Sequence, residues 1–178
     1  MNTWFTRVRG GGVRLRITRE EASVVHALVT QLLELLGGPS PAKRDDGLPN
    51  LSFSDNTTVS DDPVLARLFP DAYQDDGAAS AEFRRYTEAS LRDGKREAAE
   101  LVLDTLGEGG EIILDDEQAQ VWLRSLNDLR LALGTRLEIT EESLERTRTL
   151  DWNDPRTAPF AAYDWLTYLQ EDLVRALW

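Results

Sequence analysis

The chain has 178 residues, of which 20 are Lys or Arg and 32 are Asp or Glu, so its formal net charge is −12. It has no cysteine and a single histidine, which excludes disulfide scaffolds, thiol nucleophiles and metal sites built from these side chains. A charge this negative argues against a protein whose main affinity is for nucleic acid or an anionic membrane. The length fits one domain over residues 1–178. No stretch resembles a secretory or membrane-spanning segment, so we expect a cytoplasmic protein.

The first 18 residues predict a β-ribbon. Residues 4–9 and 13–18 alternate apolar and polar side chains on either side of three consecutive glycines, a pattern typical of a hairpin. The first 19 residues contain five arginines and no acid, so the rest of the chain carries a charge of −17. Two interpretations of this basic face stay open: it contacts nucleic acid or an acidic partner, or it covers the protein's own acidic surface. The residues that we single out for partner binding are Arg7, Arg9, Arg14 and Arg16.

Helices are predicted on both sides of a long loop. A capping box at residues 18–21 starts a helix whose apolar residues recur at helical spacing as far as Leu36. Residues 39–60 are rich in Pro, Ser, Asp and Asn, and they predict a loop that either binds a ligand or stays mobile. A short helix is expected over 62–70, with Pro63 at its first position.

The second half of the chain predicts more helices and one strand. Residues 78–106 have helical periodicity, and Gly94 either kinks this helix or divides it. Residues 111–114 are a strand candidate that could pair with the ribbon. Further helices are expected over 115–134, 141–148 and 158–178. In the helix over 78–106, the positions expected to face the core are Phe83, Tyr86, Leu91, Ala98, Leu101, Val102 and Leu106.

These elements define the predicted fold class. It is α+β but mostly α: a helical domain of about five to seven helices, with a small antiparallel β-ribbon near the N-terminus.

No pattern of residues predicts catalysis or metal binding. The sequence contains no nucleophile elbow, P-loop, dinucleotide-binding glycine motif or zinc-protease motif. Asp71, Asp75 and Asp76 form the densest acidic cluster, but the sixth position of a calcium loop, which should be glycine, is Asp76. We therefore expect no catalytic residue, no cofactor and no metal site, and we do not expect an enzyme.

Polar residues in the leucine-rich segment 121–137 predict a structural network. Buried polar groups are stable only when they are paired, so a hydrogen-bonded Asp–Arg arrangement is expected around this helix. The alternative is that these arginines face a protein partner. The residues assigned to the structural network are Asp128, Arg130 and Arg136, together with Arg84 and Arg85.

Four segments of the chain resemble a known family. They are 68–73 (LFPDAY), 82–88 (EFRRYTE), 122–137 (WLRSLNDLRLALGTRL) and 163–166 (YDWL). In this order they resemble the actinobacterial oxidative stress transcriptional regulators AosR, formerly classed as a domain of unknown function. The resemblance implies a cytoplasmic regulator of oxidative-stress gene expression without catalytic residues. Because this chain has no cysteine, it has no thiol that an oxidant could switch.

The acidic charge and the resemblance together suggest how such a regulator would act. We expect it to reach promoters through a protein partner, a sigma factor or RNA polymerase, without tight DNA binding of its own. Two alternatives stay open: an accessory factor of Clp-type regulated proteolysis, suggested by gene neighbourhood in the family, and an acidic protein-binding module. No membrane contact is expected, and a homo-oligomer stays open.

Overall fold

A computed structural model describes residues 3–37, 60–147, 151 and 153–178 of the chain. Within these residues the protein is mainly helical, with one small antiparallel sheet, which confirms the predicted fold class. The loop predicted over 39–60 lies outside the described residues apart from Ser60. None of the helices in the described ranges combines the length and apolar character needed to cross a membrane.

The sheet has three strands in the order β1-β2-β3: β1 (Phe5–Arg7), β2 (Val13–Ile17) and β3 (Gly110–Leu114). Leu15 lies opposite Phe5 on one side and Ile112 on the other, so the 111–114 segment pairs with the ribbon as predicted. Gly12 has a φ of +76°, and a Cβ there would lie 2.3 Å from the carbonyl oxygen of Leu114. Only glycine fits this turn.

The helices begin at the caps that the sequence predicts. Thr18 and Asp115 each form a capping box, which satisfies backbone N–H groups at the starts of α1 and α4. The helical elements are α1 (Arg19–Leu36), α2 (Pro63–Leu68), α3 (Gly77–Leu106), α4 (Asp116–Arg136), α5 (Glu141–Thr147), the 3₁₀ turn η1 (Pro155–Thr157) and α6 (Ala158–Leu177).

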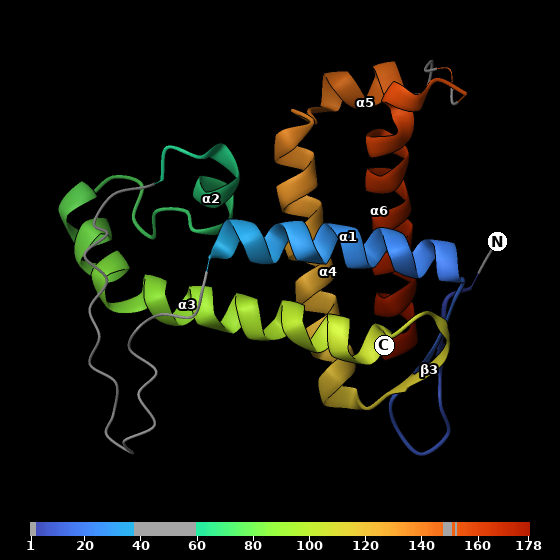
Figure 1. Ribbon diagram of the computed structural model, residues 1–178. Coiled ribbons are helices and arrows are strands. Elements are labelled where there is room, and N and C mark those ends of the chain that lie inside the picture. The colour runs from blue at the N-terminus through green and yellow to red at the C-terminus, as the bar shows by residue number, and fades with distance from the viewer. Residues whose placement is uncertain (1–2, 38–59, 148–150, 152) are drawn as a thin grey trace.

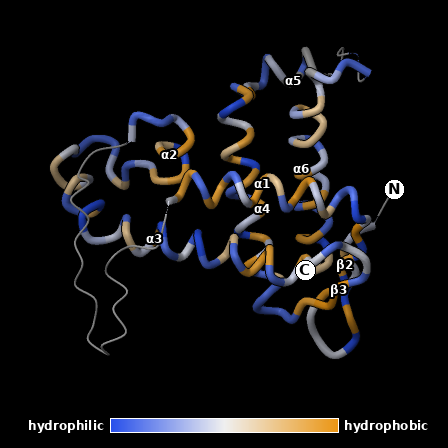
Figure 2. The backbone as a smooth tube through the Cα atoms, viewed as in Figure 1, coloured by the Kyte–Doolittle hydropathy of each residue, from blue (hydrophilic) through white to orange (hydrophobic). Residues whose placement is uncertain are grey.

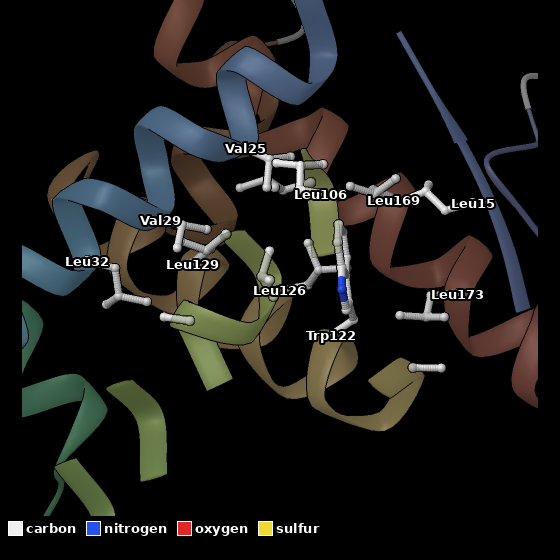
Figure 3. Close-up of a cluster of buried hydrophobic side chains, with 14 of the residues drawn as sticks. Leu15, Val25, Val29, Leu32, Leu106, Trp122, Leu126, Leu129, Leu169 and Leu173 are labelled. Carbon is white, nitrogen blue, oxygen red and sulfur yellow. The ribbon is translucent and has the colours of Figure 1, made fainter. Parts of the chain in front are cut away.

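Two pairs of helices cross to form the core. Figure 1 shows α1 and α3 running side by side in front of α4 and α6, with the sheet at one end of the crossing. The fully buried Trp122 of α4 lies at the centre, and its indole N–H donates to the Thr105 hydroxyl at 2.8 Å. Figure 3 shows Val25, Leu106 and Leu169 converging around it from three other helices. Figure 2 shows hydrophobic segments meeting in the same region.

Helix α3 confirms its predicted extent but not the whole of its predicted buried face. It is one continuous helix of 30 residues, so of the two alternatives at Gly94, a kink or a division, the division is excluded. Three of its predicted core positions, Phe83, Tyr86 and Leu91, are 45%, 59% and 51% exposed, and that part of the prediction was wrong. At the C-terminal end of the same helix, Val102 and Leu106 are buried as predicted.

Candidate protein-interaction surface

The arginines of the ribbon lie against acids of the same chain. Arg7 of β1 forms an ion pair with Asp116, at the start of α4, with an N–O distance of 2.6 Å. Arg14 and Arg16 of β2 both reach Glu111 of β3, at 3.3 and 2.9 Å. Chain segments about 100 residues apart in sequence therefore neutralise each other at this sheet.

The ribbon region contains two further arginines and a hydrogen bond to Asp116. Arg19 pairs with Glu108 at 2.6 Å, while Arg9 is exposed at the turn. Asp116 also accepts a hydrogen bond from the backbone N–H of Gly12 at 3.0 Å. That bond, followed by Arg7, holds the pKa of Asp116 below its usual value. This geometry favours the second interpretation of the basic face, and partner binding by these arginines stays a prediction.

A buried ionic network fills the first half of α3. The guanidinium of Arg84, only 5% exposed, donates to Glu88 at 3.1 Å, to the carbonyl oxygen of Phe69 at 2.9 Å and to Asp71 at 3.1 Å. Glu88 is equally buried and also accepts from Arg92 at 3.1 Å. Each buried charge in this network has an opposite charge beside it, as stability requires.

Cations of α3 also stabilise the end of α1, which has no basic residue in its last turn. Arg92 donates to the carbonyl oxygen of Leu36 at 3.1 Å, and Arg96 donates to that of Gly37 at 3.3 Å. Positive charge at a helix C-terminus interacts favourably with the helix dipole and satisfies free carbonyl groups. Arg92 also lies over the Phe69 ring, 4.9 Å from its centroid, in cation–π geometry.

The network predicted around α4 is present only in pieces. Asp128 is buried, but it pairs with Lys95 of α3 at 2.7 Å and not with an arginine. Arg136 pairs with Asp62 at 3.0 Å, so one Asp–Arg pair does form at the end of this helix. Arg85 is exposed, in contrast to its buried neighbour Arg84.

Arg130 has neutral partners instead of an acid. Its guanidinium donates to Thr167 at 3.1 Å and to Gln170 at 2.9 Å, and it lies 5.8 Å from the centroid of the Tyr163 ring. All three partners belong to α6. Arg130 therefore joins α4 to α6, as a structural role requires.

The sequence analysis missed Lys95, Arg92 and Arg96, which are central to these contacts. A usable signal was present, because Arg84, Glu88 and Arg92 follow one another at intervals of four residues. Helix α1 also ends without a basic residue of its own, so the carbonyl groups of its last turn would be stabilised by a cation from elsewhere in the fold.

The acidic cluster near the start of α3 serves the fold. Asp71 accepts from Arg84, and Asp76 caps α3 by accepting from the backbone N–H of Ala79 at 3.0 Å. Across the described residues, no group of three or more His, Cys, Asp or Glu side chains could hold a metal ion.

Because the buried face of α3 is ionic in its first half, apolar side chains lie on its outer face. Phe83 contacts Tyr73 edge-on, with ring centroids 6.3 Å apart, and both rings are about half exposed. Phe83, Ser90, Gly94 and Leu101 lie on one face of the helix, because their spacings of 7, 4 and 7 residues match whole turns. These four residues form a stripe along α3 that begins at Phe83, one ring of the exposed aromatic pair, and passes through the middle of the helix.

This stripe leads into a groove of about 590 Å³ between α3 and α4. Its apolar lining includes Leu91, Ala98 and Leu101 from α3 and Val121 from α4. Gly94 lies between these α3 residues, and a Cβ there would meet no atom within 4 Å. A groove with such a lining can receive apolar side chains of a partner.

The ion pair of Lys95 and Asp128 forms a polar part of the groove lining. Burial raises the pKa of Asp128, although the neighbouring Lys95 ammonium acts in the opposite direction. Arg124 and Asn127 add further polar groups from α4. The groove therefore combines an apolar surface with fixed hydrogen-bonding groups.

Comparison with known proteins identifies the family. Residues 1–177 match the family model described as Domain of unknown function (DUF2017). Proteins of Mycobacterium tuberculosis and Mycobacterium bovis named "Oxidative stress regulator AosR" are each 35% identical over 184 residues, covering 94% of this chain and 83% of theirs. A Mycobacterium leprae protein is 34% identical over 192 residues, covering 98% of this chain and 87% of its own. No solved structure matches the chain. The family resemblance is thus confirmed, and the chain belongs to the DUF2017 family as a relative of the mycobacterial AosR regulators.

Proposed function

We propose that this protein is a non-catalytic, cytoplasmic regulator of transcription in the response to oxidative stress. It acts by binding a sigma factor or RNA polymerase and not by recognising DNA on its own. The regulatory role is supported by the name of its relatives, "Oxidative stress regulator AosR", with which it shares about a third of its residues over nearly its whole length.

One observation carries the choice of protein contact over DNA contact. The most basic segment of the chain is the ribbon, and Arg7, Arg14 and Arg16 are already paired with the carboxylates of Asp116 and Glu111. A duplex would have to break these pairs and approach a chain of net charge −12. Phosphate binding relies on free cations that release counterions, so such an approach is unfavourable.

The proposal is tested by fluorescence anisotropy with labelled promoter duplexes at physiological salt, with and without RNA polymerase holoenzyme. The protein alone should leave the anisotropy unchanged up to micromolar concentration. Added together with holoenzyme, it should form a complex that gel filtration separates from free polymerase. Tight, sequence-specific binding of the duplex by the purified protein alone would refute the proposal.

The absence of cysteine bears on which protein senses the oxidant. The chain has no thiol and only one methionine, Met1, so it has no reversible thiol switch. Peroxide should therefore leave the circular dichroism spectrum and the oligomeric state of the isolated protein unchanged. We therefore assign the sensing of the oxidant to the partner. A peroxide-induced conformational change of the isolated protein that a thiol reductant reverses would contradict this assignment.

A further inference from the structure

We propose that the groove between α3 and α4 binds an amphipathic helix of a partner protein whose polar face is basic. The apolar face of that helix would lie on Leu91, Leu101 and Val121, with its closest approach at Gly94. This inference rests on the proposed function only because both require a protein partner. It adds the place of contact and the chemistry of the partner segment.

The shape of the groove fits a helix. The α3 side of the groove runs from Ser90 to Leu101, about three turns and about 16 Å, and Phe83 lies on the same face about two turns further towards the N-terminus. An amphipathic helix of similar length presents apolar side chains at the same intervals and can lie along such a stripe. Since Gly94 has no side chain, the backbone of a docked helix can approach α3 closely at mid-length.

The charge around the groove determines the polar face of the partner helix. Asp93, Glu97 and Asp104 follow along α3 at spacings of four and seven residues, so they form an acidic edge beside the stripe. The groove lining itself is balanced in charge, because Lys95 and Arg124 accompany Glu97 and Asp128. The excess of negative charge therefore comes from the acidic edge beside the groove and from the chain as a whole. Residues 20–178 carry a net charge of −17, so the field of the chain attracts a basic segment and repels an acidic one.

The test uses the full-length ¹⁵N-labelled protein and a synthetic Leu/Lys peptide of about 18 residues, the length of five helical turns. Leucines occupy one face of the peptide and lysines the other. Amide shifts should be largest at Leu91, Gly94, Val121 and Arg124. A peptide with the same leucines but glutamates in place of lysines should not bind.

Two variants locate the contact. A Cβ at Gly94 would meet no atom within 4 Å, so Gly94→Leu places its side chain in the groove and should weaken binding of the Leu/Lys peptide by about tenfold or more. Val174→Leu adds apolar bulk at an exposed position on α6 and should leave binding unchanged. Circular dichroism of both variants should match the parent, because both positions are exposed.

The inference is overturned if the peptide shifts concentrate on the ribbon or α6, if the glutamate peptide binds equally well, or if Gly94→Leu has no effect. It is also overturned if the parent chain is a dimer that Gly94→Leu converts to a monomer, since the occupant is then a second copy. A complex with polymerase that forms normally with Gly94→Leu would refute this inference and leave the proposed function intact. If the peptide binds at the groove but the protein forms no complex with polymerase, the proposed function is refuted and this inference stands.

Discussion

The two halves of α3 bury different kinds of side chain. Towards its C-terminal end the helix buries Ala99, Val102 and Leu106, which is the ordinary apolar face of a packed helix. In its first half the buried residues are polar or charged: Ser80, Arg84 and Glu88.

The neighbours of each half explain the difference. Leu106 packs into the apolar centre near Trp122 (Figure 3). The first half instead lies against the ends of α1 and α2, where the carbonyl groups of Leu36 and Phe69 need hydrogen-bond donors. The free carbonyl groups at a helix end are stabilised by a cation from the neighbouring helix, and a cation that is buried in this way needs a carboxylate beside it. An amphipathic pattern therefore identifies the buried face only where the neighbouring surface is apolar.

The largest effect is expected in the apolar half. Leu106→Ala removes a side chain that is 1% exposed and leaves a cavity beside Trp122. The free energy of unfolding should fall by about 3–4 kcal/mol, as for other fully buried leucines. Urea unfolding followed by tryptophan fluorescence measures it, and a loss below about 1 kcal/mol would show that this half is not packed as described.

In the ionic half, Glu88→Ala should cost slightly less, about 3 kcal/mol. The change removes the buried carboxylate that pairs with Arg84, but the more exposed Asp71 remains beside the guanidinium. Arg85→Ala is the matched control, because Arg85 is exposed and its loss should change the unfolding free energy by less than about 0.5 kcal/mol. If Glu88→Ala proved as neutral as the control, the ionic half would contribute nothing to stability.

Gly94 lies between the two halves of α3, and its replacement by alanine should stabilise the protein. Gly94→Ala should raise the free energy of unfolding by about 0.5–1 kcal/mol, because alanine restricts the unfolded chain and no atom obstructs its Cβ. Differential scanning calorimetry would register this as a higher melting temperature. A lower melting temperature would indicate that α3 bends at this residue.

The smallest effect concerns pH at the contact between Lys95 and Asp128. Burial raises the pKa of Asp128 in the folded protein above its unfolded value of 3.8. Between these two pKa values the folded state binds more protons than the unfolded state, so the free energy of unfolding falls as the pH rises from the lower value to the higher one. Asparagine does not titrate. Asp128→Asn should therefore become more stable relative to the parent between pH 3 and neutral pH, as measured by urea midpoints. A difference that moves in the opposite direction would mean that Lys95 lowers the pKa more than burial raises it.

The sequence predicts most of the fold because local signals specify most of its elements. Capping at Thr18 and Asp115 and the glycines at 10–12 determine where the helices and the hairpin begin and turn. These caps and turns depend on neighbours in sequence. The strand at residues 111–114 is also expected from its own residues, although its pairing with β2 joins distant parts of the chain.

The candidate surface could not be predicted in the same way, because it depends on contacts between distant segments. Arg84 is buried by contacts with Phe69 and Asp71, which follow α2. Arg92 reaches the carbonyl oxygen of Leu36 at the end of α1, 56 residues earlier in the chain. Lys95 and Asp128 are 33 residues apart and meet only when α3 and α4 pack together. Hydrophobic periodicity contains no information on these contacts.

The inverted polarity in the first half of α3 is tested most directly by two adjacent substitutions. The free energy of unfolding should fall by about 3 kcal/mol in Arg84→Ala, which leaves Arg92 as the remaining cation beside the buried Glu88 and removes the donor to the Phe69 carbonyl. It should fall by about 1 kcal/mol in Phe83→Ala, which removes a half-exposed ring and its contact with Tyr73. The reverse order, with Phe83→Ala the more damaging change, would show that α3 buries its apolar face and would contradict the exposed stripe and the groove.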